Sequence, residues 1–348
     1  MQAKAFISQS ALQHNIAQAR RLAPQSKIVA MVKANAYGHH LEHIEPLLAQ
    51  AEMLAVSELS EAKRLRQLSD KPILLLCGVY SDRDLDQAQQ LDCTVVLHAT
   101  EQLPIITNST QKLKIWIKVD TGMHRLGLTP EQYQQAIGAL TQCPHIDTQV
   151  VMSHFACADE STHPMNAQQL SVFNQLQIHT KKSMANSAML ISNSETHFDY
   201  VRPGIMLYGV SPFGTPDTQL KAVMQLQAPV LAIRQLEAGE SVGYGATFVA
   251  DKPTTLATIG IGYGDGYPRH MKNGAPVSIG GKLCRLAGRV SMDLITVDVT
   301  NMSVNIGDNA TLWGDENTPV EVLAQYADTT AYELITGVCS RVNFSSAP

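Results

Sequence analysis

Residues 53–99 read MLAVSELSEAKRLRQLSDKPILLLCGVYSDRDLDQAQQLDCTVVLHA, and apolar runs alternate with helical periods along them. The runs 53–57, 72–78 and 93–99 are apolar or β-branched, as in buried strands. The segments 58–68 and 82–91 carry apolar residues at helical spacing, and Ser57 and Ser81 stand where helix N-caps are expected. The stretch therefore predicts three strands joined by two helices.

The same alternation continues over residues 1–221. Further strand-like runs lie at 27–35, 113–120, 149–155, 183–188 and 200–210. Another helical period, 130–140, follows Thr129, with Gln132 at the capping-box position. A doubly wound open sheet has the same local pattern, but a count of eight strands favours a (β/α)8 barrel.

Residues 222–348 have a different texture. Strand-like runs punctuated by Gly, Asp, Asn and Pro fill most of this part, and only 319–326 and 331–339 show a helical pattern. We therefore expect an α/β protein of two domains. Residues 1–221 would form the barrel, with the first few residues able to pack on the second domain, and residues 222–348 would form a mostly β domain.

The composition excludes several classes of protein. Apolar residues make up 45% and charged residues 16%, so a disordered chain is excluded. The net charge of −5 predicts neither a nucleic-acid nor a membrane partner. The apolar runs are far shorter than the ~20 residues of a membrane span, and the first residues show no secretory pattern. The six scattered cysteines suit free thiols, so we expect a cytoplasmic globular protein.

In a barrel, residues after the strands line the active site. These positions hold Lys33, Tyr37, Lys118, Arg125, His154, Asn186, Ser187, Arg202, Gly204 and Tyr208. Several cations at one mouth imply an anionic ligand, and Ser187 with Gly204 could offer a hydroxyl and an N–H to a phosphate. Lys33 ends the apolar run AMVK, where burial and other cations would lower its pKa and favour a Schiff-base lysine. A strand-end lysine that only forms surface ion pairs would look the same.

His39 and His43 have the i, i+4 spacing of metal ligands. No carboxylate and histidine set accompanies them, so we expect no metal site. A solvated loop or a contact at the rim of the phosphate site is the expected role of these histidines.

Eight blocks of the sequence resemble the signature blocks of bacterial alanine racemases. They are AMVKANAYGH (30–39), KVDTGMHRLG (118–127), SHFACAD (153–159), ANS (185–187), VRPGIMLYG (201–209), VGYGATF (242–248), IGYGDGYPR (261–269) and AGRVSMD (287–293). The blocks follow the order of the family and span nearly the whole chain. KANAYGH alone would indicate only a barrel of the pyridoxal-phosphate type, whereas the eight together are specific for the family.

The resemblance implies a pyridoxal 5'-phosphate enzyme that interconverts L- and D-alanine, supplying D-alanine for peptidoglycan. It also implies a head-to-tail homodimer in which each active site is completed by the partner subunit. Lys33 would carry the cofactor and act as one of two bases, and Tyr263 of the partner subunit would be the other. The phosphate would be held by Tyr37, Ser187, Gly204 and Ile205, the last two through backbone N–H groups.

The remaining residues implied by the resemblance surround the cofactor and the substrate. Arg125 would contact the phenolic oxygen of the cofactor and the substrate carboxylate, which the backbone N–H of the partner's Met292 would also reach. Lys118 matches a lysine that is carbamylated in many family members and orients the arginine. Arg202 would face the pyridine nitrogen, and His154 would bridge Arg202 to Tyr263.

The chemistry of these residues favours a racemase, but alternatives stay open. Racemisation needs an acid or base on each face of a planar carbanion, and Lys33 with Tyr263 supplies two such groups. An amino-acid decarboxylase on the same plan would be expected to place an acidic residue where Arg202 stands. A non-catalytic carrier of pyridoxal phosphate would lack the second domain. A racemase of another small amino acid, such as serine, is not separated by the sequence.

The C-terminal segment departs from the family pattern. Residues 340–344 read SRVNF, where members more usually have Arg-Val-Pro-Arg, often after a tyrosine. The missing tyrosine affects an expected contact near the phosphate and the substrate entrance, but not the chemistry.

Overall fold

The computed structural model describes residues 2–347. Contacts divide the chain into two compact units. We call residues 15–36 and 44–207 the barrel unit, and residues 2–14, 37–43 and 208–347 the sheet unit. The domain division expected between residues 221 and 222 stays a prediction.

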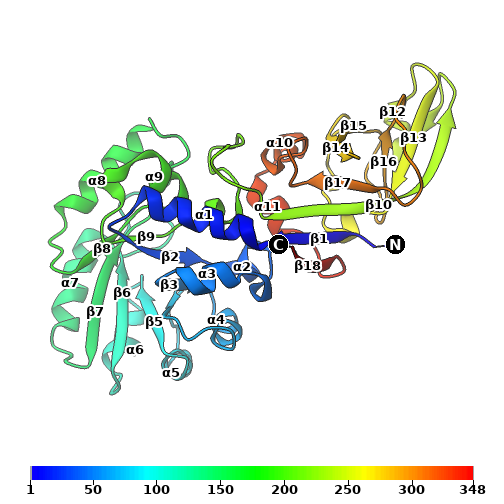
Figure 1. Cartoon of the computed structure of the whole chain (residues 1–348). Coiled ribbons are helices and arrows are strands. Elements are labelled where there is room, and N and C mark those ends of the chain that lie inside the picture. The colour runs from blue at the N-terminus through cyan, green and yellow to red at the C-terminus, as the bar shows by residue number, and fades with distance from the viewer. Residues whose placement is uncertain (1, 348) are drawn as a thin grey trace. The chain divides into compact units, whose positions relative to one another are not determined.

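The barrel unit contains a closed ring of parallel strands, with helices outside it (Figure 1). The strands are β2 (Lys27–Met31), β3 (Met53–Val56), β4 (Ile73–Leu75), β5 (Cys93–Leu97), β6 (Leu113–Lys118), β7 (Ile146–Met152), β8 (Lys181–Ser183) and β9 (Tyr200–Val201). Each strand pairs in parallel with the next, and β9 pairs with β2 to close the ring. The predicted eight-stranded barrel is confirmed.

Helices alternate with these strands. They are α3 (Glu45–Gln50), α4 (Leu59–Arg66), α5 (Asp82–Gln90), α6 (Gln102–Thr107), α7 (Pro130–Leu140), α8 (Pro164–Gln175) and α9 (Ser187–Ser192), and α1 (Gln9–Leu22) precedes β2. The caps predicted at Ser81 and Thr129 are confirmed, since their hydroxyls accept the N–H groups of Asp84 and Gln132. The cap predicted at Ser57 is wrong. Glu58 is the N-cap, and the longer Glu61 side chain reaches back to the N–H of Ser57 at 3.0 Å.

The last two barrel strands differ from their predicted ranges. The run 183–188 was expected as a strand, but β8 ends at Ser183. Asn186 instead caps α9 by accepting the N–H of Met189 at 3.1 Å, because its short polar side chain favours a helix start over a strand. The eighth run continues beyond β9 as the short 3-10 helix η3 (Ile205–Tyr208).

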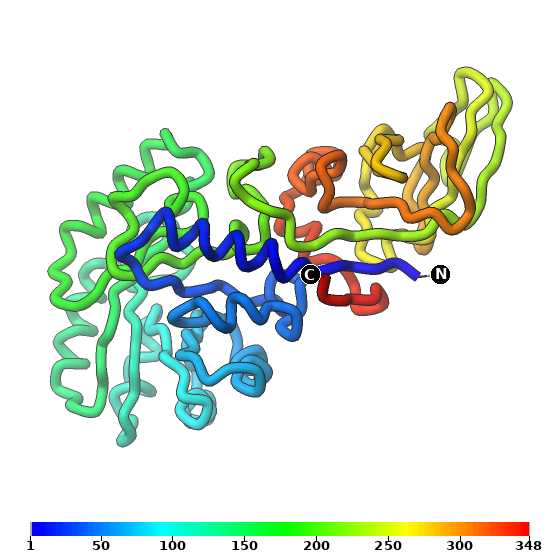
Figure 2. The backbone as a smooth tube through the Cα atoms, in the orientation of Figure 1, coloured from blue at the N-terminus to red at the C-terminus, as the bar shows by residue number. Residues whose placement is uncertain are grey.

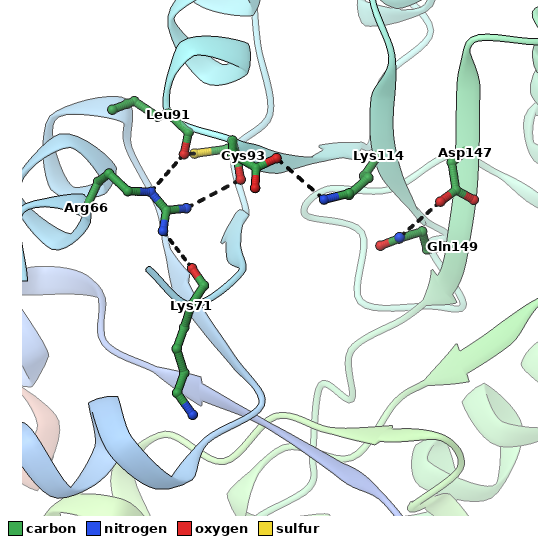
Figure 3. Close-up of polar contacts among 8 residues, drawn as sticks. Arg66, Lys71, Leu91, Cys93, Lys114, Asp147 and Gln149 are labelled. Carbon is green, nitrogen blue, oxygen red and sulfur yellow. Dashed lines mark hydrogen bonds and ion pairs between the residues drawn. The ribbon is translucent and has the colours of Figure 1, made fainter. Parts of the chain in front are cut away.

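The strands β3, β4 and β5 are buried on both faces, as their apolar runs predict. The strands β7 and β8 instead begin with exposed or half-buried residues. At the amino-terminal end of the barrel, Arg66 of α4 donates to the carbonyl of Leu91 at 3.0 Å and to that of Lys71 at 2.9 Å (Figure 3). Lys114 pairs with Asp92 there at 3.4 Å. These contacts fasten the strand starts, and the opposite end is the one at which barrels place their chemistry.

The sheet unit is built on one mainly antiparallel sheet with the order β13-β16-β15-β14-β17-β10-β1-β18. Its strands are β1 (Lys4–Ser8), β10 (Met224–Leu236), β13 (Thr254–Ile259), β14 (Pro276–Ile279), β15 (Lys282–Leu286), β16 (Ile295–Asp298), β17 (Asn309–Trp313) and β18 (Asn343–Ala347). Because β13 also pairs with β10, the first six strands of that order close into a ring. The mostly β second part of the chain is confirmed.

Both ends of the chain enter this sheet. β1 lies between β10, which it meets antiparallel, and β18, which it meets in parallel (Figure 2). The strands β11 (Ser241–Val242) and β12 (Phe248–Val249) form a small hairpin that does not pair with the main sheet, and the helices are α10 (Val320–Tyr326) and α11 (Ala331–Thr336). Within residues 2–347, no helix has both the length and the apolar character needed to cross a bilayer. The six cysteines are free thiols.

Candidate active site

Five basic side chains gather at the carboxyl end of the barrel strands. Lys33 follows β2, Lys118 ends β6, Arg125 lies in the next loop, and His154 and Arg202 follow β7 and β9. The pKa of His154 lies well below its ordinary value because the ring is buried and because the other four charges act on it. The structure thus brings together five residues that the sequence placed separately at strand ends.

The two lysines of this cluster have a lower proton affinity than an exposed lysine. Burial, followed by the charge of Arg125, lowers the pKa of Lys33. Burial and the charges of Arg202, Arg125 and Lys33 lower the pKa of Lys118 to about 8. Both amines are therefore closer to the neutral, nucleophilic form than a surface lysine.

Arg202 is the most deeply buried cation, with an exposed fraction of 4%. Its Nη1 donates to Ser183 Oγ at 2.7 Å, its Nη2 donates to the Ser153 carbonyl at 2.5 Å, and Nη2 lies 3.4 Å from His154 Nδ1. Burial lowers its pKa to about 10, so it stays charged at neutral pH. Among residues 2–347, no carboxylate accepts a hydrogen bond from it.

Hydrogen-bond donors for an anion lie on the neighbouring segments. Ser187 Oγ accepts the N–H of Gly204 at 2.9 Å and that of Met206 at 3.4 Å, which brings Ser187, Gly204 and Ile205 together. The Arg202 N–H donates to the Ala185 carbonyl at 2.9 Å, so the two segments run side by side. Hydroxyl and N–H donors beside a basic cluster fit a phosphorylated cofactor such as pyridoxal phosphate.

The segment after Lys33 is a left-handed turn. Ala34, Asn35, Ala36 and Tyr37 have φ values of 51°, 52°, 58° and 51°. Each non-glycine residue in this region costs about 1–2 kcal/mol, so strain is concentrated directly after the candidate cofactor lysine. The strand predicted over residues 27–35 is therefore wrong beyond Met31.

Tyr37 belongs to the sheet unit, where its ring stacks on Tyr208 at 5.0 Å. Burial raises the pKa of Tyr37, so its hydroxyl keeps the proton that it would donate to a phosphate. His39 is fully buried and stacks on the same Tyr208 ring at 4.6 Å. The solvated loop expected for His39 is wrong, because the left-handed turn directs this residue into the core.

Tyr263 and Met292 lie side by side in the sheet unit. Tyr263 begins the 3-10 turn η5 (Tyr263–Asp265), and its N–H donates to the Ser291 carbonyl at 3.0 Å. The next N–H, of Gly264, donates to the Met292 carbonyl at 2.8 Å. Their exposed fractions are 40% and 54%, so both side chains are accessible in a single chain.

Comparison with known proteins gives two matches to family models. The alanine racemase N-terminal domain matches residues 7–212, and the alanine racemase C-terminal domain matches residues 223–345. The chain belongs to the alanine racemase family.

Individual members of the alanine racemase family match over nearly their whole length. The alanine racemase of Vesicomyosocius okutanii is 57% identical over 98% of this chain and 97% of its own. The structure of alanine racemase from Acinetobacter baumannii has a TM-score of 0.95 at 39% identity, covering 99% of both chains. That from Bartonella henselae, with covalently bound pyridoxal phosphate, has a TM-score of 0.91 at 32% identity, covering 100% of both chains.

Sequence reasoning missed Asp265 and Arg341, which brace the Tyr263 turn in this member of the alanine racemase family. The Asp265 carboxylate accepts the N–H of Gly262 at 2.9 Å and pairs with Arg341 Nε at 2.7 Å. Arg341 also pairs with Asp293 at 2.6 Å, so it ties together the segments that carry Tyr263 and Met292. Asp265 and Asp293 stand inside quoted blocks, but only the fold reveals their shared partner.

The atypical C-terminal residues have structural roles. Asn343 and Phe344 begin β18, and the Phe344 ring stacks on His40 at 3.8 Å. No local signal in the sequence indicates this contact, because nearly the whole chain separates the two residues.

Proposed function

We propose that the protein interconverts L- and D-alanine with pyridoxal 5'-phosphate, using two bases from two subunits of a homodimer. The observation that carries this proposal is the basic cluster around Lys33, with a buried Arg202 that has no carboxylate partner among residues 2–347. Membership of the alanine racemase family supports the activity and the cofactor.

Lys33 is the first proposed base. When bound, pyridoxal phosphate withdraws electrons from the amino acid and so acidifies its Cα–H. Lys33 would hold the cofactor in the resting enzyme and take or return the Cα proton on one face of the substrate. Burial and the charge of Arg125 favour the neutral amine that this task requires.

Tyr263 of the partner subunit is the second proposed base, on the opposite face. Its hydroxyl would deliver a proton to Cα when Lys33 removes one. In the other direction, Tyr263 would remove the proton and Lys33 would deliver one. The braced turn and the 40% exposed fraction of Tyr263 suit a side chain that serves another subunit's site. His154, 3.4 Å from Arg202, would connect that arginine to Tyr263.

Arg125 and Met292 are proposed to position the substrate. Arg125 would contact the phenolic oxygen of the cofactor and the substrate carboxylate, which the Met292 N–H of the partner would also reach. Lys118 would orient Arg125. Because its pKa is lowered to about 8, a larger fraction of Lys118 is neutral near physiological pH than of a surface lysine. The neutral amine is the form that adds carbon dioxide and releases a proton to give a carbamate.

Tyr37, Ser187, Gly204 and Ile205 are proposed to hold the phosphate, and Arg202 the pyridine nitrogen. Arginine donates hydrogen bonds but does not accept a proton, so the pyridine nitrogen would stay neutral. A cofactor with a neutral nitrogen would withdraw electrons less strongly than one with a protonated nitrogen. This favours a racemase over a decarboxylase. The match to the C-terminal family model disfavours a carrier of pyridoxal phosphate, and serine stays an alternative substrate.

The cellular role follows from the activity. We infer that the enzyme works in the cytoplasm and supplies D-alanine for peptidoglycan.

The first experiment incubates the cofactor-loaded enzyme with L-alanine in D2O and follows optical rotation and Cα–H exchange together. Rotation should fall to zero while deuterium enters Cα, without release of carbon dioxide or pyruvate. Release of carbon dioxide would instead identify the enzyme as a decarboxylase and overturn the racemase proposal. If neither rotation nor exchange changes, alanine is not the substrate, and serine and other L-amino acids are tested next.

Tyr263→Phe tests the second base. The variant should keep the bound cofactor but lose racemisation, because only the acidic hydroxyl is removed. Tyr326→Phe, which removes a hydroxyl elsewhere in the sheet unit, is the matched control and should retain activity. Full activity in Tyr263→Phe would disprove the assignment of Tyr263.

A further inference from the structure

A buried glutamine of α8 connects segments that carry the basic cluster. Gln169 has an exposed fraction of 0%. Its Oε1 accepts the N–H of Ala156 at 2.9 Å, and its Nε2 donates to the His154 carbonyl at 3.0 Å and to Thr121 Oγ1 at 3.4 Å. The amide orientation is therefore fixed, because its oxygen and its nitrogen meet different kinds of partner.

The Thr121 contact leads to the loop of Arg125. Thr121 is buried at the start of the segment 121–127, and its Oγ1 lies 2.8 Å from Ser153 Oγ. At Gly122 (φ +134°), an added Cβ would lie 3.5 Å from Gln169 Cγ, so the loop passes closely over the glutamine. Gln169 thus supports the base of the loop that presents Arg125.

The His154 contact leads to Arg202. The Ser153 carbonyl accepts Arg202 Nη2 at 2.5 Å, and the next carbonyl along the chain, of His154, accepts Gln169. Two consecutive peptide groups are therefore held by two different buried side chains. This fixes the backbone of His154, whose Nδ1 lies 3.4 Å from Arg202.

We propose that Gln169 is a positioning residue, which sets the His154–Arg202 pair through the His154 carbonyl and the Arg125 loop through Thr121. The inference rests on the proposed function, because His154, Arg202 and Arg125 act on cofactor and substrate there. Gln169 itself contacts other protein groups and belongs to a helix outside the strand ring.

Gln169→Met tests the proposal in the cofactor-loaded enzyme, because methionine keeps the length of the side chain and removes all three hydrogen bonds. We expect kcat per bound cofactor to fall about 10- to 100-fold, the size of effect that small misplacements of catalytic groups produce. Gln168→Met, the same change at an exposed neighbour, is the matched control and should keep kcat within about twofold. A kcat for Gln169→Met as high as that of the control would overturn the proposal.

Thr121→Val separates the two branches. It removes the hydroxyl that joins the Arg125 loop to Gln169 and leaves the His154 contact in place. We expect KM for alanine to rise about tenfold with little change in kcat, because substrate placement is affected more than the proton transfers. A merely stabilising role would move neither constant per folded enzyme, and an unchanged KM would overturn the Thr121 branch.

Hydrogen–deuterium exchange keeps this test separate from that of the proposed function. Peptides covering 120–128 and 153–158 should exchange faster in Gln169→Met than in Gln168→Met, and unchanged exchange would overturn the proposal. If wild-type enzyme fails to racemise alanine, the proposed function is overturned. The exchange measurement still tests whether Gln169 holds the segments 120–128 and 153–158. If Gln169→Met does not fold, the isosteric Gln169→Glu, which loses the two donated bonds, replaces it with the same expected outcomes.

Discussion

Lys118 ends β6 at the centre of the basic cluster, where burial and three neighbouring cations lower its pKa from 10.5 to about 8. Between these two pH values the folded protein binds fewer protons than the unfolded chain. The free energy of unfolding therefore rises with pH across this window, and the full cost of the buried charge is present below about pH 8. The buried charges of the basic cluster therefore lower the free energy of unfolding, and the same charges serve the proposed chemistry.

Lys118→Met should therefore stabilise the protein at pH 7 while impairing activity. Removing the charge recovers at most about 3 kcal/mol, and the gain over wild type should shrink as the pH rises through 8 towards 10. Urea unfolding at several pH values, in buffers free of carbon dioxide, measures this. Lys114→Met, at an exposed lysine of the same strand, should change stability little at any pH. A gain for Lys118→Met that does not vary with pH would contradict the linkage argument.

The basic residues of the site were predictable, because barrels place the residues after their strands at one mouth whatever the loops do. Lys33, Lys118 and Arg202 needed only the strand positions for that. The left-handed turn after Lys33 was not predictable, since Ala34 and Ala36 have no preference for positive φ. Its consequence, the burial of His39, was missed for the same reason.

At the scale of elements, α4 fastens the amino-terminal end of the barrel through its last residue. The Arg66 guanidinium donates to the carbonyls of Leu91 and Lys71, which lie before β5 and β4 (Figure 3). It also donates to the carbonyls of Ser69 and Asp92 in the same two segments. One side chain thus satisfies four backbone acceptors at the starts of two strands. Because this end lies opposite the basic cluster, its contribution is to stability.

Arg66→Ala should lower the free energy of unfolding by about 1–3 kcal/mol, since a partly buried charged donor is lost from several carbonyls. The kcat and KM of the folded enzyme should stay unchanged. Chemical unfolding monitored by circular dichroism checks the first expectation, and steady-state kinetics the second. Lys63→Ala, on the exposed side of the same helix, is the control. Equal stability of the two variants would contradict the role assigned to Arg66.

Elements with a clear apolar period were predictable, and those with polar residues on the buried side were not. Ser81 and Thr129 stand directly before the helical periods of α5 and α7 and cap them. The starts of these two helices were therefore predicted to the residue. α8 was not among the segments named for their helical period, because Gln169 and Asn166 are polar residues at buried positions and break its apolar pattern. The polar residues that hide a helix from sequence analysis are here the ones that hold the neighbouring loops.

At the scale of the whole molecule, the proposed bases lie in different units of the chain. Lys33 belongs to the barrel unit and Tyr263 to the sheet unit. The sequence predicted both parts through their contrasting textures, and the order of the blocks identified the family. It could not show which chain supplies Tyr263 to a given Lys33, because spacing along one chain does not define contacts between two.

Hybrid dimers decide this point. Lys33→Ala and Tyr263→Phe should each be inactive alone. A dimer of one chain of each kind has one site with both bases altered and one site with both intact, provided that each site takes Tyr263 from the partner. Co-expression with two different affinity tags and sequential purification isolates this hybrid, which should show about half of the wild-type kcat per dimer. If each site took both bases from its own chain, every site of the hybrid would lack one base. An inactive hybrid that holds cofactor in its Tyr263→Phe chain would therefore disprove the shared site, and a monomeric wild type would disprove it directly.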